Sequence, residues 1–146
     1  MISLNIFAKC PNTGNPKQRM GELLDKKGRS DLAKIMLINI LEEMHNINIS
    51  LKTNLWVYPN IDNEWIKKLS KKYFITLKKQ IGESLCSRMQ NCLLSESALG
   101  GKTLLIGTDI PALSKNKISE AIKTLNNNNI VIGPTYDEGF YLIGIN

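Results

Sequence analysis

The chain alternates short apolar runs with segments of helical periodicity. This alternation is typical of an α/β fold, in which helices cross over between the strands of a mostly parallel sheet. We predict six strands from the apolar runs, at residues 2–8, 50–57, 73–77, 103–107, 130–133 and 140–145. The run at 103–107 is apolar throughout, so we expect this strand to be central and covered on both faces.

Four helices are expected between the strands. The first would begin at Ser30 or Asp31, either of which can cap a helix, and would end at about Asn46. Spacing predicts its buried stripe: Leu32, Ile35, Met36, Asn39, Ile40 and Glu43. Three shorter helices are predicted at 62–72, at 84–95 and from 114 to about 126.

Two of these helices have a clear apolar face. The helix at 62–72 is expected to bury three side chains: Trp65, Ile66 and Leu69. The helix at 84–95 is expected to bury four: Leu85, Met89, Cys92 and Leu93.

Length, charge and cysteine content define the broad class of protein. With 146 residues, 42% of them hydrophobic, the chain is expected to form a single domain. Nineteen Lys and Arg against thirteen Asp and Glu give a net charge of +6, which favours anionic partners. Three cysteines without a paired framework indicate a reducing compartment, and the N-terminus is typical of a strand and not of a signal peptide. We therefore expect a cytoplasmic protein with no membrane span.

Residues 12–28 are rich in Gly, Asn, Pro and charge and predict a loop. Three cations and two glycines lie in or beside it: Lys9, Lys17, Arg19, Gly14 and Gly21. Because ligands bind at the carboxyl ends of strands in open α/β sheets, such a loop suits a di- or triphosphate. The alternative is a solvated basic loop, since the segment has neither Walker nor GxGxxG spacing.

A second motif, GTDIPAL, places Asp109 directly after the apolar strand at 103–107. A lone buried carboxylate is costly, and a Mg²⁺ ion bridging to phosphate oxygens would compensate it. The alternative is that Asp109 caps a turn before Pro111.

Two further segments carry candidate residues. In IGPTYDEGFY, the turn between two strands can present Asp137 and Tyr141 beside one pocket, although Gly and Pro already explain a plain hairpin. In QIGESLCSRM, Gly82 precedes a helix that carries Arg88, and such a helix start favours anions.

Two other kinds of site are not expected. The lone His45 has no metal-site partner in the sequence. No RNP-like or helix-turn-helix pattern accompanies the lysines, so nucleic acid is not the expected partner.

Together, four segments resemble one family. FAKCPNTGNPKQRM is similar to FAKxPxxGxxKTRL, QIGESLCSRM to QxGxxLGERM, GTDIPAL to GSDxPxL, and IGPTYDEGFYLIGI to LGPxxDGGYYLLGL. These are the patterns of the selenodomain-associated, DUF-type group of glycosyltransferase-like proteins. That group is related to the molybdenum-cofactor and phospholactate guanylyltransferases in the nucleotide-diphospho-sugar transferase superfamily.

The resemblance implies a three-layer α/β/α, Rossmann-like (GT-A-like) fold whose mostly parallel sheet has one antiparallel strand. It implies Mg²⁺ or Mn²⁺ at Asp109, which would also be catalytic together with Asp137. By matching position it implies ligands for a nucleotide or nucleotide sugar: Lys9, Gly14, Lys17, Arg19, Gly82 and Arg88. Asp137 and Gly139 would lie on the side of a small-molecule acceptor.

The chain also departs from these patterns. Gln18 replaces Thr, Cys86 replaces Gly, and Glu138 replaces the first Gly of DGG. Family members continue into a further helix and strand with a DxDTPEDL-like acidic segment. We therefore expect residues 1–146 to form one GT-A-like domain that is shortened at its C-terminus.

The leading hypothesis is a metal-dependent transferase that moves a glycosyl group from a nucleotide-diphospho-sugar to an unknown acceptor. One alternative is a nucleotidylyltransferase, in which an acceptor phosphate attacks a triphosphate and pyrophosphate leaves. Another is a non-catalytic nucleotide-binding module. The sequence also leaves room for a homodimer.

Overall fold

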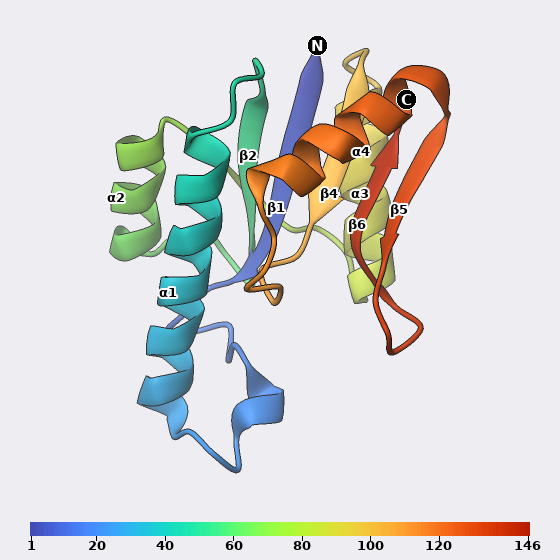
Figure 1. The fold of residues 1–146 in the computed structure, drawn as a ribbon. Helices are drawn as coiled ribbons and strands as arrows, with labels where there is room; N and C mark the ends of the chain where they lie inside the picture. The colour runs from blue at the N-terminus through green and yellow to red at the C-terminus, as the bar shows by residue number, and fades with distance from the viewer.

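Six strands form one mixed sheet in the computed structural model, which describes all residues from 1 to 146 (Figure 1). In spatial order they are β3 (Thr76–Lys79), β2 (Lys52–Tyr58), β1 (Ile2–Lys9), β4 (Lys102–Ile106), β6 (Phe140–Ile145) and β5 (Ile130–Pro134). β1 pairs in parallel with β2 and β4, whereas β6 runs antiparallel to both of its neighbours. The predicted mostly parallel sheet with one antiparallel strand is therefore confirmed.

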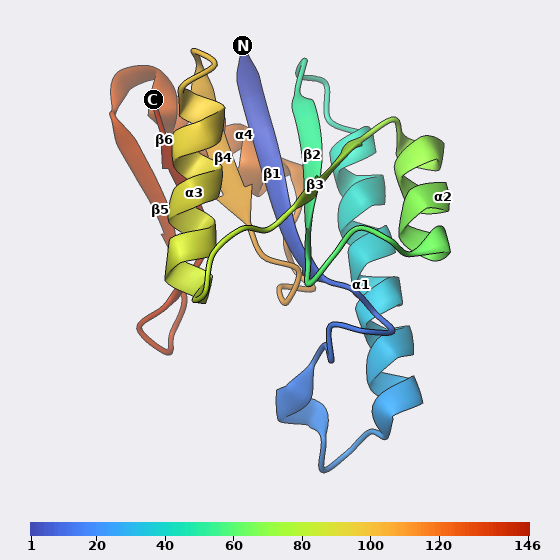
Figure 2. The same cartoon turned by 180° about the vertical axis from the view of Figure 1, so that it is seen from behind.

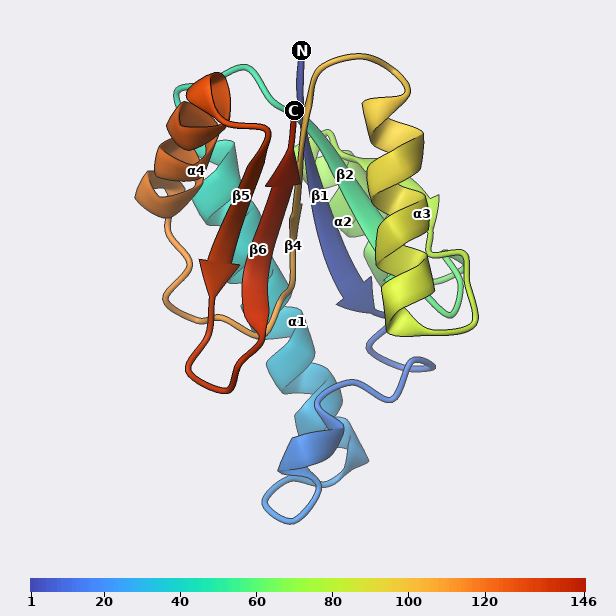
Figure 3. The same ribbon diagram turned by 90° about the vertical axis from the view of Figure 1, so that its right-hand side faces the viewer.

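Four α-helices cover the sheet: α1 (Lys26–His45), α2 (Glu64–Tyr73), α3 (Leu85–Ser97) and α4 (Lys115–Asn127). α1 and α4 lie on one face and α3 on the other, as the views from behind and from the side show (Figure 2, Figure 3). Ile66 and Leu69 of α2 join the same core cluster as α1 and α4. This arrangement confirms the three-layer α/β/α fold. None of the helices is both long and apolar enough to cross a membrane.

The carboxyl halves of β1 and β2 and most of β4 are apolar, and side chains from both faces of these strands are buried. In β1, Ile6 is fully buried in the larger cluster shared with α1 and α4, while its neighbour Phe7 is buried in the smaller cluster under α3. Side chains alternate between the two faces of a strand. Because both faces of β1 are covered at its carboxyl half, successive residues there are apolar. Residues 103–106 of β4 are likewise buried, which confirms the predicted central strand.

A buried polar network holds α3 against the amino half of the sheet. The Glu96 carboxylate is fully buried and forms ion pairs with Lys78 and, at 3.6 Å, with Lys52. It also accepts a hydrogen bond from the side-chain amide of Asn54 at 3.1 Å, and Asn54 donates at 2.9 Å to Asn5. Burying a carboxylate is tolerable here because two ammonium groups and an amide compensate its lost hydration.

The first helix begins earlier than predicted. α1 starts at Lys26, because the Asp25 side chain accepts a hydrogen bond from the Gly28 N–H at 2.7 Å and caps the helix there. Ser30 and Asp31 are not the cap. The predicted stripe was also wrong except at Ile40, since the buried face is Ser30, Ala33, Leu37, Ile40, Leu41 and Met44. Apolar residues occur all round this helix, so spacing alone does not select the face that meets the sheet.

Two other predictions need correction. The strand predicted at 73–77 is displaced: Tyr73 ends α2, Phe74 has a left-handed φ of 53° that terminates the helix, and β3 begins at Thr76. In α3, Leu85 is 55% exposed at the first residue of the helix, and the buried face of α3 consists of Cys92 and Glu96. In contrast, β6 has its predicted bounds, and α2 buries Ile66 and Leu69 as expected.

We expect Glu96→Gln to lower the free energy of unfolding by about 2 kcal/mol, because Lys52 and Lys78 lose the charge that compensates them. Urea unfolding followed by Trp fluorescence measures the change. The matched control is Glu83→Gln, which removes the same charge from an exposed position and should alter stability by less than about 0.5 kcal/mol. Equal effects of the two substitutions would contradict a stabilising role for the network.

Candidate functional site

The four motifs found in the sequence meet at one edge of the sheet. Because β1, β2, β3 and β4 are parallel, their carboxyl ends lie together. Figure 1 shows at this edge the loop after β1, the loop after β4, the start of α3 and the tip of the β5–β6 hairpin. This is the edge where open α/β sheets bind ligands.

An ion pair joins the loop after β1 to the loop after β4. The Lys17 ammonium pairs with the Asp109 carboxylate and also donates to the Thr108 carbonyl at 3.3 Å. The Lys17 side chain is only 9% exposed, whereas that of Asp109 is 80% exposed. Asp109 is thus not the buried, lone carboxylate that its position after a core strand suggested.

Residues that sequence reasoning missed hold this loop in shape. The Arg29 guanidinium donates to the Asn15 side chain at 2.9 Å, and the Ser30 hydroxyl donates to Asn12 at 3.2 Å. Asn15 and Lys17 both have left-handed φ values, of 44° and 53°. Asn tolerates that conformation better than most residues, and this was the one signal in the sequence.

Gly14 lies in close contact with other backbone segments of the same chain and not with an open ligand surface. It is buried, its N–H donates to the Cys10 carbonyl at 2.8 Å, and a Cβ there would come within 2.7–2.8 Å of backbone atoms of Cys10 and Tyr58. The loop can turn back over the ends of β1 and β2 because this position has no side chain.

Lys9, Tyr58 and Arg88 form a second cationic group on the α3 side of the same edge. Lys9 and Tyr58 are paired in the β1–β2 register, and the Arg88 guanidinium carbon lies 4.2 Å from the centre of the Tyr58 ring. The Arg88 Nε is buried and has no hydrogen-bond partner. No hydrogen bond or ion pair links this group to Lys17 and Asp109.

Two residues position this second group. Gly82 has a φ of 137°, and a Cβ there would meet the Ser87 Oγ at 2.5 Å and the Arg88 N at 2.9 Å. The side-chain amide of Gln80, which is 6% exposed, donates to the carbonyls of Ala8 at 3.2 Å and Trp56 at 2.9 Å. Gln80 thereby ties the end of β3 to the ends of β1 and β2, a role that the motif alone did not reveal.

The tip of the β5–β6 hairpin presents Asp137. A hydrogen bond from the Thr135 hydroxyl at 2.5 Å lowers the pKa of Asp137, and the positive charge of Arg19 contributes to this. Arg19 is exposed on the short helix Gln18–Met20 in the loop after β1. A carboxylate with a lowered pKa is a weak general base but a good acceptor of hydrogen bonds.

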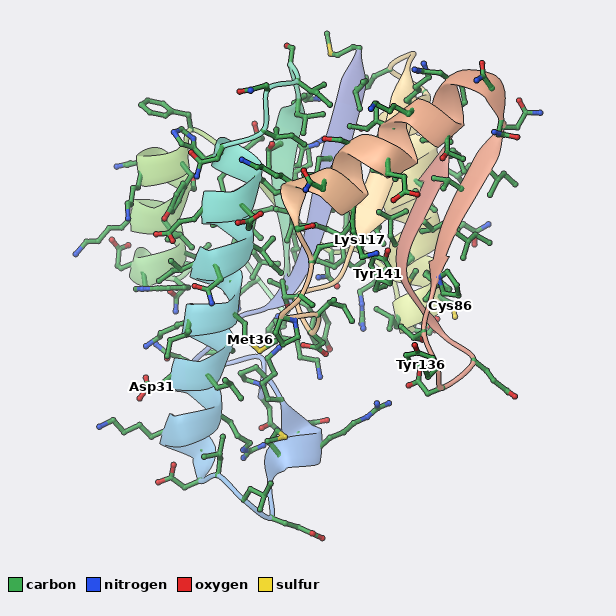
Figure 4. All side chains as sticks on the ribbon, viewed as in Figure 1. Asp31, Met36, Cys86, Lys117, Tyr136 and Tyr141 are labelled. Atoms are coloured by element: carbon green, nitrogen blue, oxygen red, sulfur yellow. The ribbon has the colours of Figure 1, made fainter.

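Tyr141 and Asp137 have different surroundings. Figure 4 shows Tyr136 at the hairpin tip and Tyr141 closer to the sheet. The Tyr141 ring packs against Gly133, where a Cβ would come within 2.6 Å of it, and Tyr141 is half-buried. Asp137 is exposed at the tip, so the two side chains differ in burial, and a shared pocket stays a prediction.

A cavity of about 180 Å³ lies away from these motifs, where the end of α1 meets the beginnings of β2 and β3. Its lining is mostly apolar and includes His45, whose ring packs edge-on against Tyr73. The candidate site at the carboxyl edge is therefore formed by exposed loops and not by this cavity.

The residues at the carboxyl edge fit a cation that is shared with a phosphate. No group of three or more His, Cys, Asp or Glu side chains could hold a metal ion by itself. Asp109 is an exposed carboxylate, a source of hard oxygen atoms, beside the cationic loop after β1. Mg²⁺ commonly takes one or two carboxylates and completes its shell with water and phosphate oxygens, so one carboxylate at this place suffices.

Comparison with known proteins identifies the family. The family model DUF2064, described as an uncharacterized protein conserved in bacteria, matches residues 45–146. The chain belongs to the DUF2064 family. No curated protein matches the chain.

Solved structures share the fold. A protein from Desulfovibrio desulfuricans, assigned by name to the nucleotide-diphospho-sugar transferases, has a TM-score of 0.84 at 24% identity over 99% of this chain. The chain spans 62% of the length of that protein. A cytidylyltransferase from Leptospira borgpetersenii has a TM-score of 0.63 at 12% identity, over 99% of this chain and 59% of its own.

A third neighbour is the 4-diphosphocytidyl-2C-methyl-D-erythritol synthase from Anaerococcus prevotii. It has a TM-score of 0.65 at 14% identity, and the match covers all of this chain and 70% of the length of that protein. At such identities the likeness shows the fold, which is the α/β fold of nucleotidyltransferases and nucleotide-sugar transferases.

The cysteines of this DUF2064 protein differ in accessibility. Cys10 and Cys92 are buried, and Cys86 is exposed at the start of α3 (Figure 4). Burial, and secondarily the charge of Glu96, raises the pKa of the Cys92 thiol well above its usual range. The thiol is therefore protonated at pH 8, and the thiolate is the nucleophilic form.

We expect N-ethylmaleimide at pH 8 to modify Cys86 within minutes and to leave Cys10 and Cys92 unmodified in the folded protein. Peptide mass spectrometry measures the sites of modification. The same reaction in about 8 M urea, which unfolds most small domains, should label all three. Rapid labelling of Cys92 without denaturant would show that α3 does not bury this thiol against the sheet.

Glu138 has a φ of 64° at the hairpin tip, where the family pattern has Gly. We expect Glu138→Gly to raise the free energy of unfolding by about 0.5–1 kcal/mol, because Gly adopts this conformation without strain. Thermal and urea unfolding measure it. In contrast, Glu120→Gly, in the middle of α4, should lower stability by about 1 kcal/mol. A loss of stability in both variants would refute the strain at Glu138.

Proposed function

We propose that this protein is a metal-dependent transferase that binds the diphosphate of a nucleotide-diphospho-sugar at the carboxyl edge of its sheet and transfers the glycosyl group to a small acceptor. The observation that carries this proposal is the contact between Lys17 and Asp109, which brings the cationic loop and the acidic motif together. The nucleotide-sugar transferase and cytidylyltransferase names of its structural neighbours support it.

In the proposed mechanism Lys17 and Arg19 hold the diphosphate, and Asp109 holds Mg²⁺ or Mn²⁺. The metal would neutralise the charge that develops on the departing nucleoside diphosphate. Lys9 and Arg88 lie on the α3 side of the edge and would contact the remainder of the nucleotide. Gly14 and Gly82 act indirectly, through the two turns that position these cations.

Asp137 would contact the acceptor. Its lowered pKa keeps it ionised at neutral pH, so it would accept hydrogen bonds from acceptor hydroxyl groups and would be a weak general base. Catalysis would then depend on positioning and on charge neutralisation more than on proton abstraction.

Nucleotidylyl transfer is the second candidate, because the same cationic loop would serve a triphosphate and because two of the neighbours are named for cytidylyl chemistry. Incubation with Mg²⁺, each nucleoside triphosphate and each nucleotide sugar separates the two. Release of pyrophosphate without sugar transfer would overturn glycosyl transfer. Nucleotide binding with no turnover in either assay would indicate a non-catalytic binding module.

A cytoplasmic location of the protein stays a prediction.

We expect Lys17→Met to weaken the binding of nucleoside diphosphates in the presence of Mg²⁺ by about tenfold or more, because a charge-assisted contact to phosphate is lost. Isothermal titration calorimetry measures the dissociation constant. The control Lys123→Met removes the same charge from an exposed position on α4 and should leave binding within about twofold of the original. Unchanged affinity in Lys17→Met would remove Lys17 from the site.

A further inference from the structure

We propose that the Lys17–Asp109 ion pair makes the site selective for a diphosphate group complexed with a divalent cation over the same anion without metal. The inference rests on the proposed function, because that function assigns phosphate to Lys17 and the cation to Asp109. It concerns the form of the ligand that the site accepts.

The two partners of the pair differ in their access to water. With 9% exposure, the Lys17 side chain is nearly enclosed, and the loop around it supplies one other acceptor, the Thr108 carbonyl at 3.3 Å. The Asp109 side chain is 80% exposed. A cation from solvent can therefore reach Asp109 directly, whereas most of the Lys17 side chain is covered and its ammonium group is already paired with Asp109.

A metal-free diphosphate meets an unfavourable arrangement. In the ion pair the charges of Lys17 and Asp109 cancel, so the two together do not attract an anion. To contact Lys17, the anion has to displace Asp109, which then stands as an uncompensated carboxylate beside a multiply charged anion. Like charges in such contact repel, and this repulsion weakens binding.

A divalent cation removes both obstacles. It can replace Lys17 as the partner of Asp109, since carboxylate oxygens are preferred Mg²⁺ ligands. The Lys17 ammonium is then available to phosphate oxygens that bind the same cation. Each charged group exchanges one partner for another, and none is left without compensation.

The surrounding loop favours this exchange. The Thr108 carbonyl can retain Lys17 in place, and the bond from Arg29 to Asn15 supports the loop two residues earlier in the chain. The exposed Asp109 side chain is thus the part that moves. The pair acts as a specificity-determining contact without requiring a rearrangement of the fold.

The first test measures binding of inorganic pyrophosphate by calorimetry, with Mg²⁺ and with a chelator, for the original protein and for Asp109→Asn. We expect Asp109→Asn to bind metal-free pyrophosphate about fivefold more tightly, because Lys17 has lost its competing partner. The strengthening of binding by Mg²⁺ should fall from about tenfold or more to about threefold or less. The matched control is Glu138→Gln, which removes a carboxylate from the same edge.

The second test measures binding of Mn²⁺ alone by electron paramagnetic resonance. Lys17→Met should bind Mn²⁺ about threefold more tightly than the original protein, since Asp109 is then unpaired. The control Lys26→Met removes an exposed cation at the start of α1 and should change Mn²⁺ binding by less than about twofold.

Tighter metal-free binding in Asp109→Asn but not in Glu138→Gln supports the inference. An unchanged affinity in Asp109→Asn, or an equal gain in both variants, overturns it and leaves the proposed function standing, provided that the original protein binds pyrophosphate with Mg²⁺. If the original protein binds no pyrophosphate in either condition, the proposed function fails and the inference fails with it.

Discussion

The parallel pairing of β1 with β2 on one side and β4 on the other is the constraint on which the rest of the structure depends. Backbone hydrogen bonds set this register, and the buried side chains of β1 lock it from both faces. Parallel strands end at the same edge, so segments separated by some ninety residues come within reach of each other. The contact between Lys17 and Asp109 is a direct consequence.

The two faces of the sheet are stabilised in different ways. Under α1, α2 and α4 lies a large apolar cluster, whereas on the other face Cys92 of α3 packs with three buried residues of the sheet, beside the polar network around Glu96. The directed bonds of that network determine how α3 sits along the sheet. Because Arg88 lies on the same helix, a network at the amino half of the sheet also places a cation at the carboxyl edge.

Much of the fold could be predicted from the sequence, and the errors have physical causes. The central strand β4 was found because burial on both faces requires an apolar run. The start of α1 was missed because Asp25 caps it in a segment without apolar periodicity. The predicted position of β3 was too early because Tyr73 and Phe74 are aromatic residues that favour strands, whereas in the structure they form the end of α2.

The candidate site was predictable in its residue types but not in its contacts. Lys17, Asp109 and Asp137 stand out because they lie in loops that follow apolar strands, and Arg88 stands out because it lies one turn into a helix preceded by a glycine. Arg29 does not, since nothing near it along the chain distinguishes it from an ordinary polar residue, and Gln80 lies in a motif that does not reveal its bonds to Ala8 and Trp56. Their importance depends on partners that are distant in sequence.

By itself, then, the sequence determined that the chain forms an α/β sheet with cationic and acidic loops at strand ends, because hydrophobic periodicity and local composition are encoded in neighbouring residues. Only the tertiary structure decided that Asp109 is exposed and paired with Lys17, that Arg88 stacks on Tyr58, and that Glu96 is buried among lysines. These facts depend on strand order and on the face each helix covers, which are properties of the packed chain as a whole.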